Sequence, residues 1–481
     1  MLTSVTCSDP RGVPPEIIEL DKTVATLEAE IARLKLTRIK ILANQALIWR
    51  LPSEILGRIF ELGTHECNHL PQTLSLVSRS WRALALDTPV LWTYVTLDQT
   101  FGYGASDRFL RRAEAYLERS QACKILVDID CQYVDSIADL LDIMLLLEPH
   151  LHRCFSFQAF FMDWEEGITV VRDHIRGLGP SLESLSLRID PDDEDDTVPF
   201  PLLTAPCPRL QTVVLEQAPL RAVGEKFTDF SRLTTLHLVR DQRYVSHPST
   251  RTNISLTDLL DRLAALPMLT ELCIQSANIQ FDDEHMLLAS PTPTTVPSLK
   301  YLICNLIDST TLSLFLESTY FPNLERLRVQ MCNAPDDTGV QWLQHVASIS
   351  PPRLPSLRYL DLRACNVEGA ALFPFVRALR HLPELTALAL SSPPSGCIGT
   401  KLFDVLTLGQ TSTEKIAPNL QALCLQNCRD VTGHELARLV RSRLGSNHTA
   451  TIEYLKLAQC YTLDLTALKQ LAALVPVVRV V

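Results

Sequence analysis

Apolar residues recur near the start of the chain at alternating steps of four and three, which is the heptad spacing of a coiled coil. The spacing is broken at Arg38 and resumes at Ile41, so about three heptads are regular. We therefore predict a helix over residues 17–50, preceded by a disordered tail at 1–16. This helix either forms a coiled coil with another copy or folds back on its own chain. The apolar positions are Leu20, Val24, Leu27, Ile31 and Leu34.

Residues 51–92 carry a second pattern, which predicts a small helical module. Pro52 and Ser53 are typical of a helix start, because Pro fixes the entering backbone angle and Ser can accept an unpaired amide. Another helix is predicted over Gln72 to Asp87. Helices this short cannot bury all their large side chains among themselves, so they either face a partner or cap the next domain. The apolar positions are Ile55, Leu56, Ile59, Phe60, Leu74, Val77, Trp81 and Leu84.

Beyond residue 180 the chain repeats L-x-x-L-x-L, the strand signature of leucine-rich repeats. The intervals between copies fit one strand, one turn and one helix. We predict an α/β solenoid over residues 181–481, with parallel strands on the concave face and helices outside. Residues 93–180 are less regular and are interpreted as degenerate leading repeats. The copies begin at Leu182, Leu210, Leu233, Leu269, Leu299, Leu324, Leu357, Leu385, Leu420 and Ile452.

Several repeats carry a cysteine three residues after the last strand leucine or its equivalent. There the chain leaves the strand and turns inward, which suits a small buried side chain that shares backbone hydrogen bonds with its neighbours. The repeats therefore resemble the cysteine-containing class of leucine-rich repeats. These cysteines are Cys332, Cys365, Cys428 and Cys460.

Strand alternation sends the leucines to the core and the intervening residues to the concave face. Two neighbouring strands should bring together a cluster of Arg and Tyr, residue types that dominate binding hot spots. We predict that this cluster contacts a target protein; an ordinary solvated face is the alternative. The cluster comprises Arg326, Arg328, Tyr359, Asp361 and Arg363.

Charge and composition exclude some classes of function. A net charge of -11 argues against a nucleic-acid-binding protein, because such proteins carry an excess of Lys and Arg. Without a signal peptide or a long apolar run, we expect a soluble protein of the cytoplasm or nucleus with no membrane partner. The 14 cysteines are scattered through strand-like segments and are interpreted as free thiols. The acidic run from Asp190 to Asp196 predicts a solvated loop.

Catalytic motifs are weak or missing. His65 to His69 spells H-E-x-x-H, a zinc-site spacing, but it follows Gly63 and precedes Pro71, which indicates a connection between helices. No glycine-rich phosphate loop or nucleophile-elbow motif occurs in the sequence. We therefore expect no catalytic residue, no metal site and no cofactor, and interpret the protein as a non-enzyme.

The helical module also carries a family resemblance. Leu51-Pro52-x-Glu54-Ile55-Leu56-x-x-Ile59-Phe60, then Leu74-x-x-Val77-Ser78-x-x-Trp81 and Pro89-x-Leu91-Trp92, resembles an F-box-like module of the kind found in fungal families. The resemblance departs from the common pattern over 63–70, where a longer connection replaces a shorter acidic one. It implies binding to a Skp-type adaptor and, through it, a cullin. By position, the implied adaptor-binding residues are Leu51, Pro52, Ile55, Leu56, Ile59, Phe60, Val77 and Trp81.

Two functions fit these patterns. In the first, the chain is the substrate-recognition subunit of a Skp-cullin-F-box ubiquitin ligase, with the module on the adaptor and the repeats on an unknown target protein. In the alternative, it is a leucine-rich-repeat interaction scaffold outside any ligase, with self-association through the N-terminal helix.

Overall fold

The computed structural model divides into two compact units, residues 1–91 and 92–481. The first thirteen residues, most of the predicted tail, lie outside the described part of the chain. The same holds for 191–196 of the acidic run, whose first residue, Asp190, ends a strand. The structure describes residues 14–45, 47–98, 104, 106–162, 165–190, 201–203, 205–224, 230–240, 254–276, 279–280, 293–331, 342–343, 346, 353–365, 367, 369–391, 398, 400–408, 416–428, 430–444, 449–460 and 463–480.

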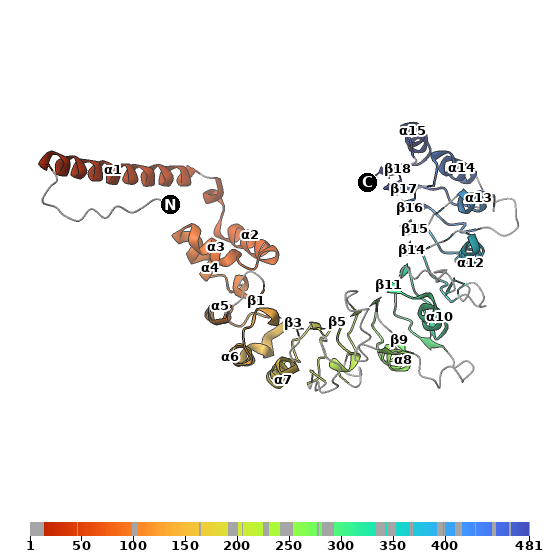
Figure 1. Ribbon diagram of the computed structural model, residues 1–481, viewed down its shortest axis with the longest axis horizontal. Helices are drawn as coiled ribbons and strands as arrows, with labels where there is room; N and C mark the ends of the chain where they lie inside the picture. Colours follow the sequence, from red (N-terminus) through yellow and green to blue (C-terminus); the bar gives the residue numbers. More distant parts are fainter. Residues whose placement is uncertain are drawn as a thin grey trace. The chain divides into compact units, whose positions relative to one another are not determined.

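The first unit begins with one long helix, α1 (Pro15–Gln45), drawn in red in Figure 1. Proline suits the first turn of a helix because its missing N–H would have no partner there. The prediction placed one helix over 17–50; the structure ends α1 at Gln45 and continues in a short 3-10 turn, η1 (Leu47–Arg50). Every α1 side chain that the structure describes is exposed. Among the described residues, no helix is both long and apolar enough to span a membrane.

Three short helices complete this unit: α2 (Ser53–Glu66), α3 (Leu70–Val77) and α4 (Arg79–Leu86). The prediction of one helix from Gln72 to Asp87 is wrong, because Ser78 is extended, with φ −159° and ψ 165°. Its hydroxyl accepts a hydrogen bond from the Trp81 backbone N–H at 3.1 Å and so caps a new helix. Around this corner the Phe60 and Trp81 rings pack with centroids 4.9 Å apart.

The second unit is built on one parallel sheet whose 14 main strands follow one another in chain order, which confirms the predicted solenoid. The alternation within each strand follows the prediction: the leucines of β5 and β6 are buried and their neighbours are half-buried. The strands are β1 (Tyr94–Leu97), β2 (Ile125–Asp130), β3 (Cys154–Met162), β4 (Ser184–Asp190), β5 (Thr212–Glu216), β6 (Thr235–Val239), β8 (Glu271–Gln275), β11 (Tyr301–Ile307), β13 (Arg326–Met331), β14 (Tyr359–Arg363), β15 (Ala387–Ser391), β16 (Ala422–Gln426), β17 (Tyr454–Ala458) and β18 (Val477–Val480).

Two small sheets accompany the main one, pairing β7 (Ile254–Ser255) with β9 (Ile279–Gln280), and β10 (Thr294–Thr295) with β12 (Thr319–Tyr320). Strands β1, β2 and β3 belong to the main sheet, so the less regular stretch before residue 180 continues the same parallel array.

Helices connect the strands and lie on the outer side of the curved sheet (Figure 1). This arrangement buries the leucine rows against the helices and leaves the alternate residues of the strands half-exposed on the concave face. The helices are α5 (Ser106–Arg119), α6 (Ile137–Leu147), α7 (Glu165–His174), α8 (Leu256–Ala264), α10 (Ser309–Glu317), α12 (Leu372–Arg380), α13 (Thr400–Leu408), α14 (Gly433–Arg443) and α15 (Leu465–Leu474). Shorter 3-10 turns are η2 (Pro89–Trp92), η3 (Cys131–Tyr133), η4 (Glu148–Arg153), η5 (Ile175–Gly177), η6 (Leu220–Ala222) and η10 (Gly369–Ala371).

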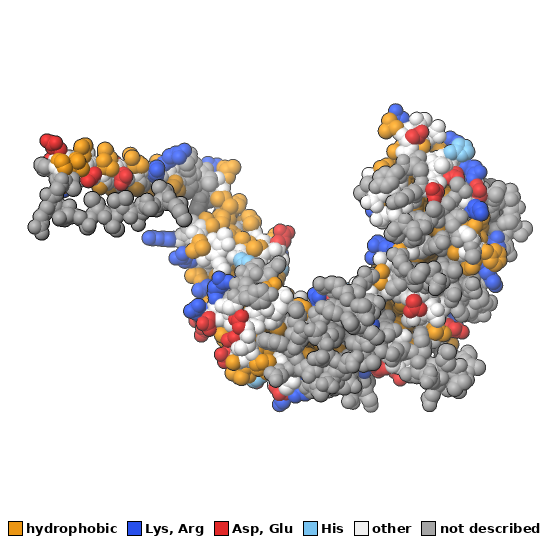
Figure 2. All heavy atoms as spheres, viewed as in Figure 1, with side chains coloured by type: hydrophobic (Ala, Val, Ile, Leu, Met, Phe, Trp, Pro, Cys, Tyr) orange, Lys and Arg blue, Asp and Glu red, His pale blue; other side chains and the backbone are white. Residues whose placement is uncertain are grey.

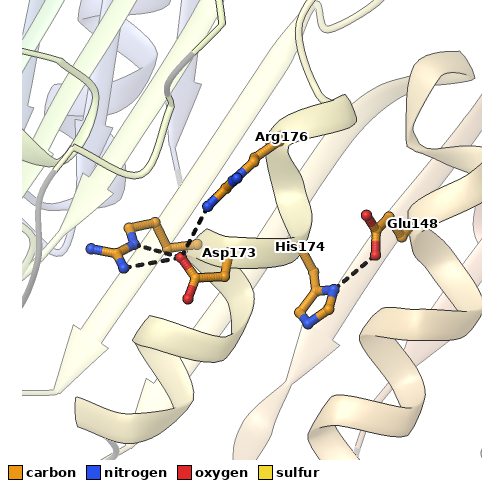
Figure 3. A network of polar contacts seen from close by, with 5 residues as sticks. Glu148, Asp173, His174 and Arg176 are labelled. Atoms are coloured by element: carbon orange, nitrogen blue, oxygen red, sulfur yellow. Dashed lines mark hydrogen bonds and ion pairs between the residues drawn. The ribbon is translucent and has the colours of Figure 1, made fainter.

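Neighbouring outer segments also meet through exposed ion pairs. Figure 3 shows His174 of α7 facing Glu148 of η4, with 2.8 Å between His174 Nδ1 and Glu148 Oε2. Beside it, Asp173 lies 3.0 Å from Arg172 and 3.7 Å from Arg176. Pairs this exposed contribute at most about 1 kcal/mol each, so the buried leucine rows, not these contacts, hold the repeats together.

A left-handed residue follows directly after several strands, where the chain turns toward the outer side. Its N–H donates to a carbonyl near the end of the next strand: Ser276 to Asn305 at 2.8 Å, for example, and Asn427 to Ala458 at 2.9 Å. The residues with positive φ at this place are Gln217 (59°), Ser276 (51°), Ala364 (52°), Asn427 (55°) and Gln459 (52°).

The predicted cysteine position follows this turn in three described repeats; Cys332 lies outside the described residues. Each thiol donates to the carbonyl two residues before it, and it also reaches the carbonyl of an earlier strand. The longer contacts are 3.9 Å for Cys365 to Val329, 4.0 Å for Cys428 to Leu390 and 3.7 Å for Cys460 to Leu425. The cysteines therefore link adjacent repeats through backbone oxygens, as the sequence pattern predicted.

Candidate functional site

The helical module divides the eight predicted adaptor-binding residues into two groups. Leu56 and Phe60 are buried, at 7% and 2% exposure, and form the inside of the module. Trp81 is half-buried against Phe60. The other predicted residues, Leu51, Pro52, Ile55, Ile59 and Val77, are exposed.

Two further apolar side chains that the sequence prediction missed lie at the surface of this module. Leu62 is 56% exposed and follows Ile55 and Ile59 at the i, i+4, i+7 spacing of one helix face. Leu76 is 78% exposed and precedes Val77 at the end of α3. Extending the α2 spacing by one more turn would have found Leu62. We call Ile55, Ile59, Leu62, Leu76 and Val77 the exposed apolar set; Figure 2 shows orange side chains over this region.

The H-E-x-x-H spacing does not produce a helical zinc site. Helix α2 ends at Glu66, Cys67 is extended with φ −145° and ψ 104°, and His69 stands at the start of α3. The two histidines therefore belong to different helices, not to successive turns of one. Within the part of the chain that the structure describes, no group of three His, Cys, Asp or Glu side chains could hold a metal ion.

Strand register brings the five predicted target-contact residues together on β13 and β14. Arg326 lies opposite Tyr359, Arg328 opposite Asp361, and Gln330 opposite Arg363. We call Arg326, Arg328, Tyr359, Asp361 and Arg363 the concave cluster.

Within this cluster, Asp361 is buried and holds two arginine side chains in place. Its side chain is 4% exposed and accepts hydrogen bonds from Arg328 Nε at 2.9 Å and Arg363 Nε at 3.2 Å. Asp361 lies under the two arginines that it binds, on the strand next to the small β15 residue Ala389. The carboxylate therefore fixes two guanidinium groups that remain about two-fifths exposed.

A third arginine of the cluster is held by aromatic rings. The Arg326 guanidinium lies 5.3 Å from the Tyr301 ring centre and 6.0 Å from that of Tyr359, both within cation–π range. Tyr301 was missed from the sequence, although it precedes Leu302 just as Tyr359 precedes Leu360. Aligning the repeats would have placed it beside Arg326, its register partner.

These side chains border a hollow of about 260 Å³ on the concave side of the sheet. Its lining residues are Glu271, Tyr301, Leu302, Ile303, Arg326, Arg328 and Tyr359. A second, smaller hollow of about 100 Å³ lies over the small residues of β15 and is bordered by Asp361, Arg363 and Lys456. Hollows of this kind can seat individual side chains of a protein partner.

Burial affects the ionisable groups in and beside this cluster. Burial, and then the nearby Asp361 carboxylate, raises the pKa of the Tyr359 phenol, so it remains a hydrogen-bond donor. Burial raises the pKa of the nearby Cys273 thiol to about 11 and also raises that of Cys424, so neither is a ready nucleophile. What the arrangement offers is a set of fixed cationic donors with aromatic walls.

Comparison with known proteins places the helical module in a family. The F-box-like family matches residues 48–98. No curated protein matches the chain in sequence. Among solved structures, a chain of the yeast Rad7 and Elc1 complex is 16% identical, with 90% of this chain and 95% of that chain covered and a TM-score of 0.37. A protein from Bacteroides fragilis is 15% identical, with 57% of this chain and 66% of that one covered and a TM-score of 0.33. Residues 48–98 are thus an F-box-like domain, carried ahead of a leucine-rich-repeat solenoid.

Proposed function

We propose that this protein is the substrate-recognition subunit of a Skp-cullin-F-box ubiquitin ligase. The F-box-like match at residues 48–98 carries the proposal, because such domains bind Skp-type adaptors. The adaptor then links the chain to a cullin, and catalysis belongs to those partners. This chain contributes proximity, since holding target and ligase together removes the entropic cost of their encounter.

The exposed apolar set supports the adaptor half of this proposal. Five large apolar side chains stay at the surface of a module whose inside is already filled by Leu56, Phe60 and Leu74. An apolar surface of this size on so small a module favours a protein partner. Leu51 and Pro52 stand exposed at the start of α2 and extend the same surface along the chain.

The concave cluster supports the target half. Arg and Tyr are the residue types that dominate binding hot spots, and here they are fixed by a buried carboxylate and by ring contacts. Prior fixing lowers the entropy lost on binding. The Arg326 guanidinium lies against two aromatic rings, so an acidic side chain of the target is the group that it fits best.

Capture of a purified Skp-type adaptor by the full chain tests the adaptor half. Ile59→Asp should reduce capture by at least about tenfold, because a buried, unpaired charge would enter the interface. Phe373→Asp is the matched control, since Phe373 is a 73% exposed apolar residue on α12 and should leave capture unchanged. Trp81→Ala is less suitable because it also removes the ring contact with Phe60. Failure of the unaltered chain to bind any adaptor would overturn the proposal.

Proximity labelling in cells tests the target half. Arg326→Glu should remove labelled target proteins while adaptor capture is retained, because the substitution reverses the charge between Tyr301 and Tyr359. Arg377→Glu, on an exposed position of the outer helix α12, is the matched control. An unchanged set of labelled proteins would remove the concave cluster from the proposal. If the protein self-associates but captures no adaptor, the interaction scaffold becomes the better description.

A further inference from the structure

Helix α1 carries an apolar seam that no described side chain of the protein covers. Its members are between 45% and 63% exposed, and Figure 2 shows their orange side chains running along the helix. Helix α1 has 31 residues, which is far longer than a helix that only caps a small module needs to be. The seam residues are Ile17, Leu20, Val24, Leu27, Ile31, Leu34 and Ile41.

The residue types along the seam specify how many helices can pair. Steps of three and four place Ile17, Val24 and Ile31 at the a positions of successive heptads, and Arg38 at the fourth. The d positions are Leu20, Leu27, Leu34 and Ile41. Branched residues at a with Leu at d favour a parallel pair over trimers or tetramers.

One pair of opposite charges beside the seam favours the same arrangement. Glu30 occupies a g position and Lys35 the following e position, which face each other across a parallel, in-register pair. Within one helix Glu30 already accepts from Arg33 at 2.6 Å, on the side away from the seam, and a carboxylate can accept from both. Glu16 and Asp21 occupy the corresponding g and e positions near the N-terminus and would repel each other across such a pair, although the helix dipole favours negative charge at this end. Arg38 at an a position sets the register at some cost in stability.

We propose that α1 of two copies pairs as a parallel, in-register, two-stranded coiled coil, so that the protein is a homodimer. This inference stands on α1 alone and does not require an adaptor or a target. A dimer would present two F-box-like domains and two concave clusters, and a target with two binding segments would gain avidity without any new contact.

Light scattering on the full chain tests the dimer directly. The expected mass is twice the 53.9 kDa of one chain. Leu27→Glu with Leu34→Glu should give monomers, since both changes put charge into the seam. The matched control is Ala29→Glu with Leu36→Glu, which adds the same charge at outer f positions of the same helix and should leave the dimer intact. A monomeric unaltered protein, or a dimer that survives the seam variant, would overturn the proposal.

Charge exchange tests the parallel register. Glu30→Lys and Lys35→Glu variants should each dimerise about tenfold more weakly, because each homodimer sets like charges opposite one another. A mixture of the two should form heterodimers preferentially. A purely statistical mixture of homodimers and heterodimers would contradict the parallel arrangement, and so would a helix covered by residues of its own chain. The seam variant should still capture adaptor, which separates failure of this inference from failure of the ligase proposal.

Discussion

Both units of this protein carry regular apolar patterns, but the solenoid buries its apolar side chains and the first unit leaves many of them exposed. In the solenoid, strand leucines such as Leu327, Leu360 and Leu388 are at most 1% exposed. In the first unit, seam residues of α1 and the Ile55 and Ile59 side chains of α2 are about half exposed. A repeat covers its apolar rows with a neighbour in the same chain, whereas no described residue covers the exposed apolar faces of α1 and α2. Periodicity therefore predicts that an apolar face exists, but not which molecule covers it.

The largest effect is expected where the solenoid buries a leucine completely. Leu360→Ala should lower the free energy of unfolding by about 3 kcal/mol, since it removes a side chain on β14 and leaves a cavity between two strands. Urea denaturation followed by circular dichroism measures this loss. A cost below about 1 kcal/mol would mean that this strand is far less tightly packed than its burial indicates.

A smaller loss is expected for the buried carboxylate of the concave cluster. Asp361→Ala should cost about 2 kcal/mol, because Arg328 and Arg363 lose a buried partner but remain partly hydrated. In a double-mutant cycle with Arg328→Ala, the two losses should be less than additive. Strict additivity would argue that the ion pair does not couple the two strands.

At the other end of the concave face, a carboxylate is expected to destabilise the fold. Burial, together with Asp98 and Asp130, raises the pKa of Asp128 from 3.8 to about 6. The folded chain therefore holds a proton there that the unfolded chain has released, so stability falls as pH rises from about 4 to above 6. Because Asp128 is partly hydrated, Asp128→Asn should raise the free energy of unfolding by only about 1 kcal/mol at pH 7.5.

This gain should disappear below about pH 4, where both forms of the chain carry a neutral side chain at this position. Asp107→Asn, a surface carboxylate at the start of α5, is the control and should change stability by less than about 0.5 kcal/mol at either pH. A pH-independent gain for Asp128→Asn would refute the electrostatic explanation.

The smallest effect is expected on the exposed face of α2. Ile59→Ala should change the free energy of unfolding by less than about 0.5 kcal/mol, because the side chain is already about half hydrated. On the same helix Leu56→Ala should cost about 2 kcal/mol. Equal losses for the two variants would show that Ile59 is covered within the protein, and the contrast between the units would weaken.

Most of the solenoid could be predicted from the sequence because the same apolar pattern recurs in each repeat. Strand positions, parallel pairing and the turn cysteines all follow from the L-x-x-L-x-L alternation. The helix break at Ser78 could not be foreseen, since the apolar spacing continues across it and only the capping hydroxyl reveals the corner. Nor could the left-handed turns after the strands, because Gln217, Ser276 and Ala364 are not residues that favour positive φ.

The candidate surfaces were predictable to different depths. Spacing placed the concave cluster correctly on adjacent strands. It did not reveal that Asp361 is buried, because that depends on how Arg328 and Arg363 fold over the carboxylate. The family pattern named the module residues without separating Phe60, which fills its inside, from Ile59, which does not. Telling the two residues apart requires knowledge of how α2, α3 and α4 pack, and a single sequence does not give that packing.

The left-handed turns give the repeat array a direction. Four of the five turn amides named above donate to the strand that comes later in the chain, as Ala364 does to Ser391 at 3.0 Å. The following repeat therefore stabilises the left-handed conformation of the turn residue through this hydrogen bond. Loss of a late repeat would therefore leave the turn amide of its predecessor without this acceptor.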